Sequence, residues 1–239
     1  MDALSCWFAA KDALQRFVLP HCCLLCGAAG EDAIDLCRAC TAELPRNRTC
    51  CARCALPLAE PAALCGACQK RPPPWDAAWV PFRYAWPLDR LESRFKFGAD
   101  LAAGRVLSTL WLREMPDAAW PALIVPVPLH RTRLRQRGYN QALELARPLS
   151  RALGVPLGAY HLRRVRATSA QTELGAQARR RNVRGAFAVS ETGWPPHVAL
   201  VDDVMTTSAT LEECSRALRR AGVKRIDVWA LARAPSIRD

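Results

Sequence analysis

Four C-x-x-C pairs in the first third of the chain constrain its fold more than any other feature. They are Cys23/Cys26, Cys37/Cys40, Cys51/Cys54 and Cys65/Cys68. Ten residues separate each pair from the next, and a shift of 28 residues places the first two pairs on the second two. Zinc needs four ligands in a tetrahedron, and a C-x-x-C turn supplies two thiolates. The spacing predicts two consecutive four-cysteine zinc ribbons in residues 21–70, with two structural zinc ions that replace a large apolar core.

The pairing of these cysteines has alternatives. Cys22 and Cys50 lie one residue before a pair and offer a C-x3-C spacing, and the four pairs could interleave in a cross-brace. A disulfide framework is the other use of such an array, which an intracellular chain disfavours. Gly27 and Gly66, each directly after a cysteine, suit turns that require a positive φ angle.

Charge is concentrated in one part of the chain. The net charge is +12, and residues 130–184 hold thirteen arginines against two acidic residues. Such a concentration favours an anionic partner, either a polyphosphate or a nucleic acid. Only four of the 34 basic residues are lysines. Arginine suits bidentate phosphate contacts, although a GC-rich genome produces the same bias.

The remaining segments divide the chain further. Residues 1–20 predict an amphipathic helix that packs on the body of the protein or binds a membrane surface or a partner. Residues 71–74, Arg-Pro-Pro-Pro, predict a stiff linker, and residues 75–239 form the main domain. The longest uncharged apolar run has 12 residues, too few to span a bilayer. Without a basic leader, we expect a cytoplasmic protein, or one held at the inner face of the inner membrane.

The main domain alternates apolar strands with helices. Strands are predicted at 123–125, 198–201 and 226–231, and helices at 140–153 and 211–221. This order predicts an α/β domain with a mainly parallel sheet, in which ligands bind at the carboxyl ends of the strands.

One such strand end carries the most informative motif of the chain. The strand 198–201 is followed by two carboxylates, Asp202 and Asp203, and then by Thr206, Thr207, Ser208, Ala209 and Thr210 at the start of a helix. Backbone amides and the helix dipole favour a phosphate there. The carboxylates suit sugar hydroxyls or a cation carried by the ligand. Thr210 with Glu213 also fits a capping box, a purely local role.

This motif resembles that of the type I phosphoribosyltransferases, which bind 5-phosphoribosyl-1-pyrophosphate (PRPP) with Mg²⁺. The resemblance implies that Asp202 and Asp203 hold the ribose hydroxyls and that Thr206, Thr207, Ser208, Ala209 and Thr210 hold the 5′-phosphate. Ser208 stands where that family usually has glycine, so a side chain lies where the phosphate approaches the backbone.

The resemblance extends over nearly the whole chain. Val125 to His130, Arg137 to Gln141, Gln171, Arg181 to Val183 and Gly185 to Phe187 are similar to motifs of the ComF family of competence-associated proteins. That family places a cysteine zinc domain before a phosphoribosyltransferase domain and is linked to the uptake of single-stranded DNA. The resemblance therefore implies the DNA-uptake machinery as a partner.

The same resemblance implies roles for several arginines. Arg135 and Arg137 are candidates for neutralising the pyrophosphate leaving group, and His130 is the nearest candidate for a general base. Contacts with pyrophosphate or nucleic acid are expected from Arg131, Arg133, Arg163, Arg164, Arg179, Arg180 and Arg181; a solvated charged face is the alternative. Tyr139 and Phe187 could stack on bases, or pack in the core.

Two functions follow from the sequence. The first is a protein that binds Mg²⁺ and PRPP, or a related phosphoribosyl ligand, and transfers phosphoribose to an unidentified acceptor. The second is a non-catalytic component that holds single-stranded DNA in the same basic crevice.

Overall fold

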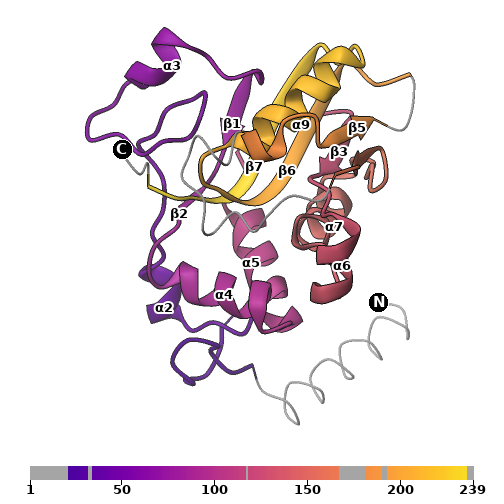
Figure 1. Ribbon diagram of the computed structural model, residues 1–239. Helices are drawn as coiled ribbons and strands as arrows, with labels where there is room; N and C mark the ends of the chain where they lie inside the picture. Colours follow the sequence, from indigo (N-terminus) through magenta and orange to yellow (C-terminus); the bar gives the residue numbers. More distant parts are fainter. Residues whose placement is uncertain (1–20, 32–33, 117, 167–180, 190–192, 236–239) are drawn as a thin grey trace, which may run out of the picture.

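The computed structural model describes residues 21–31, 34–116, 118–166, 181–189 and 193–235 (Figure 1). The amphipathic helix predicted for residues 1–20 lies outside these residues, as do Gln171, Arg179 and Arg180. The helices are α2 (Arg38–Ala42), α3 (Gly66–Lys70), α4 (Leu88–Phe97), α5 (Leu101–Arg113), α6 (Arg131–Arg137), α7 (Gln141–Leu153) and α9 (Ala209–Arg220). The strands are β1 (Ala77–Trp79), β2 (Phe82–Arg83), β3 (Leu123–Pro126), β4 (Leu162–Arg164), β5 (Phe187–Val189), β6 (His197–Met205) and β7 (Arg225–Arg233).

A parallel sheet forms the centre of the molecule. Its strands run in the order β1-β7-β6-β3, and β2 also pairs with β7. Every pairing in this sheet is parallel, which confirms the predicted α/β class and is consistent with a phosphoribosyltransferase-like fold. Two short strands, β4 and β5, form a separate antiparallel pair.

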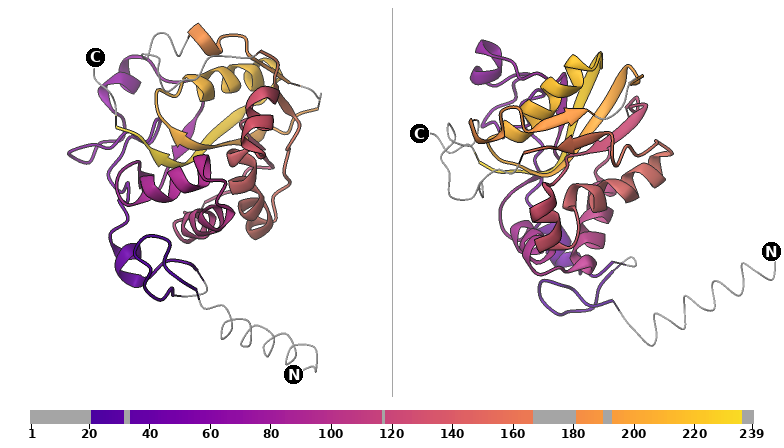
Figure 2. Two further views of the ribbon diagram at one scale, coloured as in Figure 1. Left: turned by 60° about the horizontal axis from the view of Figure 1, so that its bottom comes forward. Right: turned by 45° about the vertical axis from the view of Figure 1, so that its right-hand side comes forward.

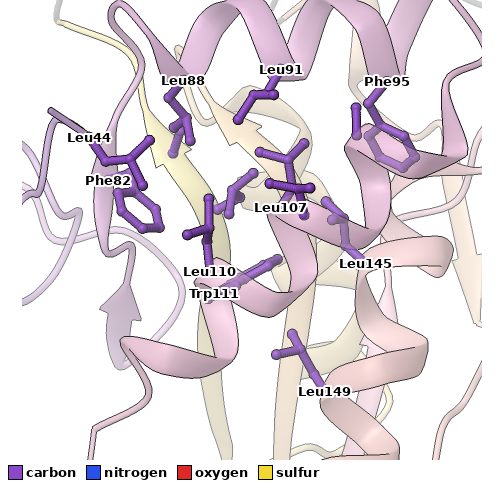
Figure 3. Packing of buried hydrophobic residues seen from close by; sticks show 14 of the residues in the cluster. Leu44, Phe82, Leu88, Leu91, Phe95, Leu107, Leu110, Trp111, Leu145 and Leu149 are labelled. Carbon is purple, nitrogen blue, oxygen red and sulfur yellow. The ribbon is translucent and has the colours of Figure 1, made fainter. Parts of the chain in front are cut away.

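The two faces of the sheet belong to different cores because side chains alternate along a strand. From β6, Ala199 and Val201 join the core that α4, α5 and α7 cover, shown in close view in Figure 3. Val198 and Leu200 point to the opposite core, which α9 covers. The predicted strand at 198–201 is therefore the buried part of a longer strand, whose last residues continue to the edge where ligands bind.

The cysteine-rich region consists of two small units that lie at opposite ends of the molecule (Figures 1 and 2). In each unit the second C-x-x-C pair opens a five-residue helix, because Cys37 is the N-cap of α2 and Cys65 the N-cap of α3. The first unit joins the core of α4 and α5 through buried Ile34 and Leu36. The second unit contacts the other core through Ala55.

One detail of the cysteine turns differs from the prediction. Gly27 has the expected positive φ of +78°. Gly66 does not, because it begins α3. In the second unit the positive φ of +52° falls on Ala55, which lies 28 residues after Gly27. The repeat thus preserves the backbone shape of this turn with a different residue type.

Candidate functional site

A cleft with a volume of about 910 Å³ opens at the carboxyl ends of β3 and β6. It brings together the end of α4, the turn between β3 and α6, α6 itself, and the connection from β6 to α9. Its lining includes all seven residues predicted to bind a phosphoribosyl ligand: Asp202, Asp203, Thr206, Thr207, Ser208, Ala209 and Thr210.

The connection from β6 to α9 forms a turn with an unusual backbone. Ser208 is the N-cap of α9 and has φ +63° and ψ +4°, in the left-handed region. Glycine takes this conformation without steric cost, which explains the glycine of the related motif. The predicted capping box is wrong: Thr210 lies inside the first turn, and the Glu213 carboxylate accepts a hydrogen bond from the Gly185 amide at 2.9 Å.

The two carboxylates do not stand alone in the cleft. Asp202 accepts a hydrogen bond from the Asp203 amide at 2.9 Å, and Asp203 accepts one from the Val204 amide at 2.6 Å. The Lys96 ammonium lies 2.8 Å from the Asp203 carboxylate. Burial, followed by the charge of Asp203, raises the pKa of Asp202 well above its usual value. Lys96 therefore neutralises one member of the pair, and the site repels an anionic ligand less than two free carboxylates would.

A third carboxylate lies behind this pair. Glu92 of α4 is fully buried, and one of its oxygens is 3.8 Å from the Lys96 ammonium. Burial raises the pKa of Glu92 to about 7. Burial alone would lower the pKa of Lys96, but the charges of Asp203 and Glu92 outweigh it and raise this pKa.

The sequence analysis missed Glu92 and Lys96, although a signal was present. Leu88, Leu91 and Phe95 mark the apolar face of α4, and Glu92 falls on this face at helical spacing. A carboxylate on a buried helix face requires a nearby cation. Lys96, one turn later and one of only four lysines, satisfies that requirement.

Three of the arginines that were predicted to contact pyrophosphate or nucleic acid lie at the cleft. Arg133, Arg137 and Arg164 line it, and the Arg137 guanidinium lies 5.5 Å from the ring centre of Phe97. Arg131, Arg135, Arg163 and Arg181 are exposed outside the lining. His130 lines the cleft as the N-cap of α6, where its ring accepts a hydrogen bond from the Thr132 amide.

Of the two roles predicted for Tyr139 and Phe187, the structure favours packing in the protein over stacking on bases. The Tyr139 hydroxyl donates to the Phe95 carbonyl oxygen, and the two rings are 5.3 Å apart. Phe187 is 5% exposed. Both therefore pack in the protein. Phe97, which lines the cleft and is 71% exposed, is an aromatic surface that the sequence analysis did not identify.

The cysteines form two four-thiol clusters. Cys23, Cys26, Cys37 and Cys40 make the first, and Cys51, Cys54, Cys65 and Cys68 make the second. Within each cluster the sulfur atoms lie within 4.8 Å of one another, as one tetrahedral zinc ion requires. Consecutive pairs thus share a site, without a cross-brace. Cys22 and Cys50 belong to neither cluster among the described residues.

The electrostatics of the first cysteines in each cluster also suit a metal. Burial opposes thiolate formation at Cys23 and Cys51, but hydrogen bonds from backbone amides outweigh it. They lower the pKa of Cys23 to about 6 and that of Cys51 to about 7. Burial raises the pKa of Cys40, Cys54 and Cys68, so zinc must displace their protons, since it binds thiolates. The four neighbouring sulfur atoms of each cluster fit a structural zinc ion.

The described residues contain no helix that is both long and apolar enough to span a membrane.

Comparisons with known proteins agree with this arrangement. The double zinc ribbon domain matches residues 14–69. Competence protein F of Haemophilus influenzae is 41% identical over 208 residues, covering 83% of this chain and 90% of that protein. DNA utilization protein YhgH of Escherichia coli K12 is 35% identical over 224 residues, covering 90% and 98%. Competence protein ComFC of Streptococcus pneumoniae is 28% identical over 156 residues, covering 64% and 66%.

Proposed function

Because the chain belongs to the family of competence protein F and ComFC, we propose that it acts in the uptake or use of DNA. Within that role, we propose that its cleft binds PRPP with Mg²⁺, or a related phosphoribosyl ligand. The names of these relatives, competence proteins and DNA utilization proteins, support the first part. The geometry of the cleft supports the second.

The convergence of the acidic pair with the start of α9 is the observation that carries the ligand proposal. Asp202 and Asp203 lie in the same cleft as the backbone turn at Thr206, Thr207 and Ser208. A helix N-terminus favours phosphate, and carboxylates suit the hydroxyls of a ribose. A phosphorylated ribose, which carries a phosphate on C5 and hydroxyls on C2 and C3, matches both parts of the cleft.

The remaining parts of the cleft suit the pyrophosphate end of such a ligand. Mg²⁺ prefers oxygen ligands and often binds through one or two carboxylates and substrate phosphates, so Asp202 and Asp203 are suitable to hold it. Arg133 and Arg137 supply fixed cations. If phosphoribosyl transfer takes place, negative charge grows on the departing pyrophosphate, and cations placed there stabilise the transition state.

Calorimetric titration of PRPP with Mg²⁺ into the full chain tests this proposal. We expect saturable binding that weakens about tenfold or more in Asp202→Asn, a loss of at least about 1.4 kcal/mol. Glu60→Gln is the control, since it removes an exposed carboxylate of the second ribbon. No binding by the unchanged protein, or equal binding by Asp202→Asn, would contradict the proposal.

Single-stranded DNA is the second candidate ligand of the cleft. Three arginines and the exposed ring of Phe97 line it, and cations combined with a stacking surface are typical of single-strand binding. We expect log affinity to fall with log salt at a slope of about −0.7 per phosphate contact. Asp202→Asn should leave this affinity unchanged. A slope near zero would exclude DNA as a ligand.

A further inference from the structure

Arg233, the last residue of β7, is a buried cation between two parts of the molecule. It is 7% exposed. Its guanidinium donates hydrogen bonds to four backbone carbonyl oxygens: those of Cys54 at 3.0 Å, Met205 at 2.7 Å, Thr206 at 2.6 Å and Ala234 at 3.0 Å. Only a guanidinium has enough donors in a rigid plane to satisfy such a set.

Three of the four acceptors of Arg233 belong to two different sites, and the fourth, Ala234, is its neighbour in the chain. Cys54 is a cysteine of the second four-thiol cluster. Met205 ends β6, and Thr206 begins the turn at the proposed phosphate site. One side chain therefore joins the backbone of a metal ligand directly to the backbone that would hold the phosphate.

Charge explains why a buried arginine is favourable here. Four thiolates around one zinc ion carry a formal charge of −2. The metal-loaded cluster thus supplies the negative charge that a desolvated guanidinium requires.

The first ribbon has a different attachment. It contacts α4, where the Arg94 guanidinium donates to the Leu24 carbonyl oxygen and to the Asp100 carboxylate. Its apolar contacts reach α4 and α5. The two ribbons can therefore be compared within one chain. Each has four cysteines at equivalent positions that fit a zinc ion, but Arg233 connects only the second ribbon to the turn after β6.

We propose that Arg233 is a positioning residue that couples zinc loading of the second ribbon to the conformation of the Thr206–Ser208 turn. Loss of zinc from the second cluster releases Cys54, removes the charge that holds the guanidinium, and loosens the turn. Coupling of this kind is reciprocal, so a ligand bound at the turn raises the zinc affinity of the second cluster by the same factor. The effect on ligand affinity rests on the proposed function, whereas the effect on the turn does not.

Hydrogen exchange of the full chain, measured by mass spectrometry, tests the effect on the turn without any ligand. The variants are Cys54→Ser in the second cluster and Cys26→Ser, its repeat equivalent in the first. We expect Cys54→Ser to speed exchange at residues 205–208 about tenfold, which corresponds to about 1.4 kcal/mol of local stability. Cys26→Ser should leave these residues within about twofold of the unchanged protein. Metal analysis should find one zinc in each variant.

Two further variants test the role of the Arg233 side chain itself. Arg233→Met removes the guanidinium, and Arg233→Lys keeps the charge without the planar set of donors. We expect both to loosen residues 205–208 while Cys26 and its cluster keep zinc. The double variant Cys54→Ser/Arg233→Met should exchange no faster than either single variant, because both act through one connection. Helix α7 serves as an internal control that stays protected.

The outcomes separate this inference from the proposed function. Unchanged exchange in Arg233→Met and Arg233→Lys, or equal loosening by Cys26→Ser and Cys54→Ser, would overturn the coupling. PRPP titration of the same variants is read independently. If the turn loosens as expected but the unchanged protein binds no PRPP, the coupling stands and the ligand proposal fails.

Discussion

Ser208 shows how a single residue departs from what its position favours. It holds a positive φ at the N-cap of α9, and its side chain caps no amide. Non-glycine residues in this region carry a steric cost of about 1–2 kcal/mol. The sequence marked Ser208 as unusual because its side chain reduces the space for a phosphate. The backbone angles add a second effect, since the serine is held in a strained conformation.

Ser208→Gly should therefore stabilise the protein. We expect a gain of about 0.5–1 kcal/mol in the free energy of unfolding, since glycine removes the strain but adds freedom to the unfolded chain. Urea denaturation measures it. Ala209→Gly, one residue later inside α9, is the matched control and should lose about 1 kcal/mol. A loss of stability in Ser208→Gly would show that the serine side chain contributes more than the strain costs.

Glu92 predicts a specific pH dependence of stability. Its ordinary pKa is 4.5, and burial raises it to about 7 in the folded protein. Between pH 4.5 and about pH 7 the folded state binds the Glu92 proton more tightly than the unfolded state. The contribution of Glu92 to the free energy of unfolding therefore falls as the pH rises. Glu92→Gln cannot titrate. We expect the unfolding free energy of the variant to improve relative to the unchanged protein between about pH 5 and about pH 8.

Denaturation curves at both pH values provide the measurement. The exposed Glu60→Gln serves as a control whose difference from the unchanged protein should be the same at both. A Glu92→Gln difference that does not vary with pH would show that Glu92 stays ionised in the folded state.

At the scale of elements, the position of α4 decides the geometry of the cleft, because α4 carries both Glu92 and Lys96. Gly104 of α5 faces α4, and a Cβ atom there would lie 2.6 Å from the Phe95 ring. The two helices approach closely at this point because α5 has no side chain there. Hydrophobic periodicity predicted β3, α7, β6, α9 and β7, but it identified neither α4 nor α5. Their contact depends on how the two helices meet.

Gly104→Ala tests that contact. We expect a loss of about 1–3 kcal/mol, since the added methyl group must push α4 away, despite the higher helix propensity of alanine. Gly66→Ala in α3 is the control, because a Cβ atom there has no atom within 4 Å. Thermal unfolding compares them. If both changes were equally tolerated, the close approach of α4 and α5 would not matter for stability.

At the scale of the whole molecule, the zinc ribbons share their cores with the sheet domain. Ile34 and Leu36 belong to the hydrophobic core that α4, α5 and α7 cover. Ala55 belongs to the hydrophobic core on the other face of the sheet, which α9 covers. The cysteine spacing predicted the members of both four-cysteine clusters, each of which fits a zinc ion. It contained no information on where the ribbons attach, because those contacts join residues far apart in the sequence. For the same reason, the sequence marked Asp202 and Asp203, and the helical spacing could connect Lys96 with Glu92, but nothing in the sequence connected Lys96 with Asp203.

Shared cores imply one cooperative unfolding transition. Removal of zinc with a chelator should lower the unfolding temperature of the whole chain, by roughly 10 °C if several kcal/mol of metal-linked stability are lost. Tryptophan fluorescence reports on the sheet domain, because Trp229 lies in β7. An unaltered transition in that domain after zinc removal would show that the ribbons fold independently.

The repeat in the cysteine region has a consequence for protein engineering. Ile34 and Leu36 anchor the first ribbon, but the positions 28 residues later hold an exposed Ala62 and a half-buried Leu64. The two units have the same cysteine spacing, but they differ at the positions that contact the rest of the protein. A chimaera in which one unit replaces the other would still bind two zinc ions, yet it would lack the side chains that fasten the first copy in place. The two units are therefore not interchangeable within this chain, although the spacing of their cysteines is identical.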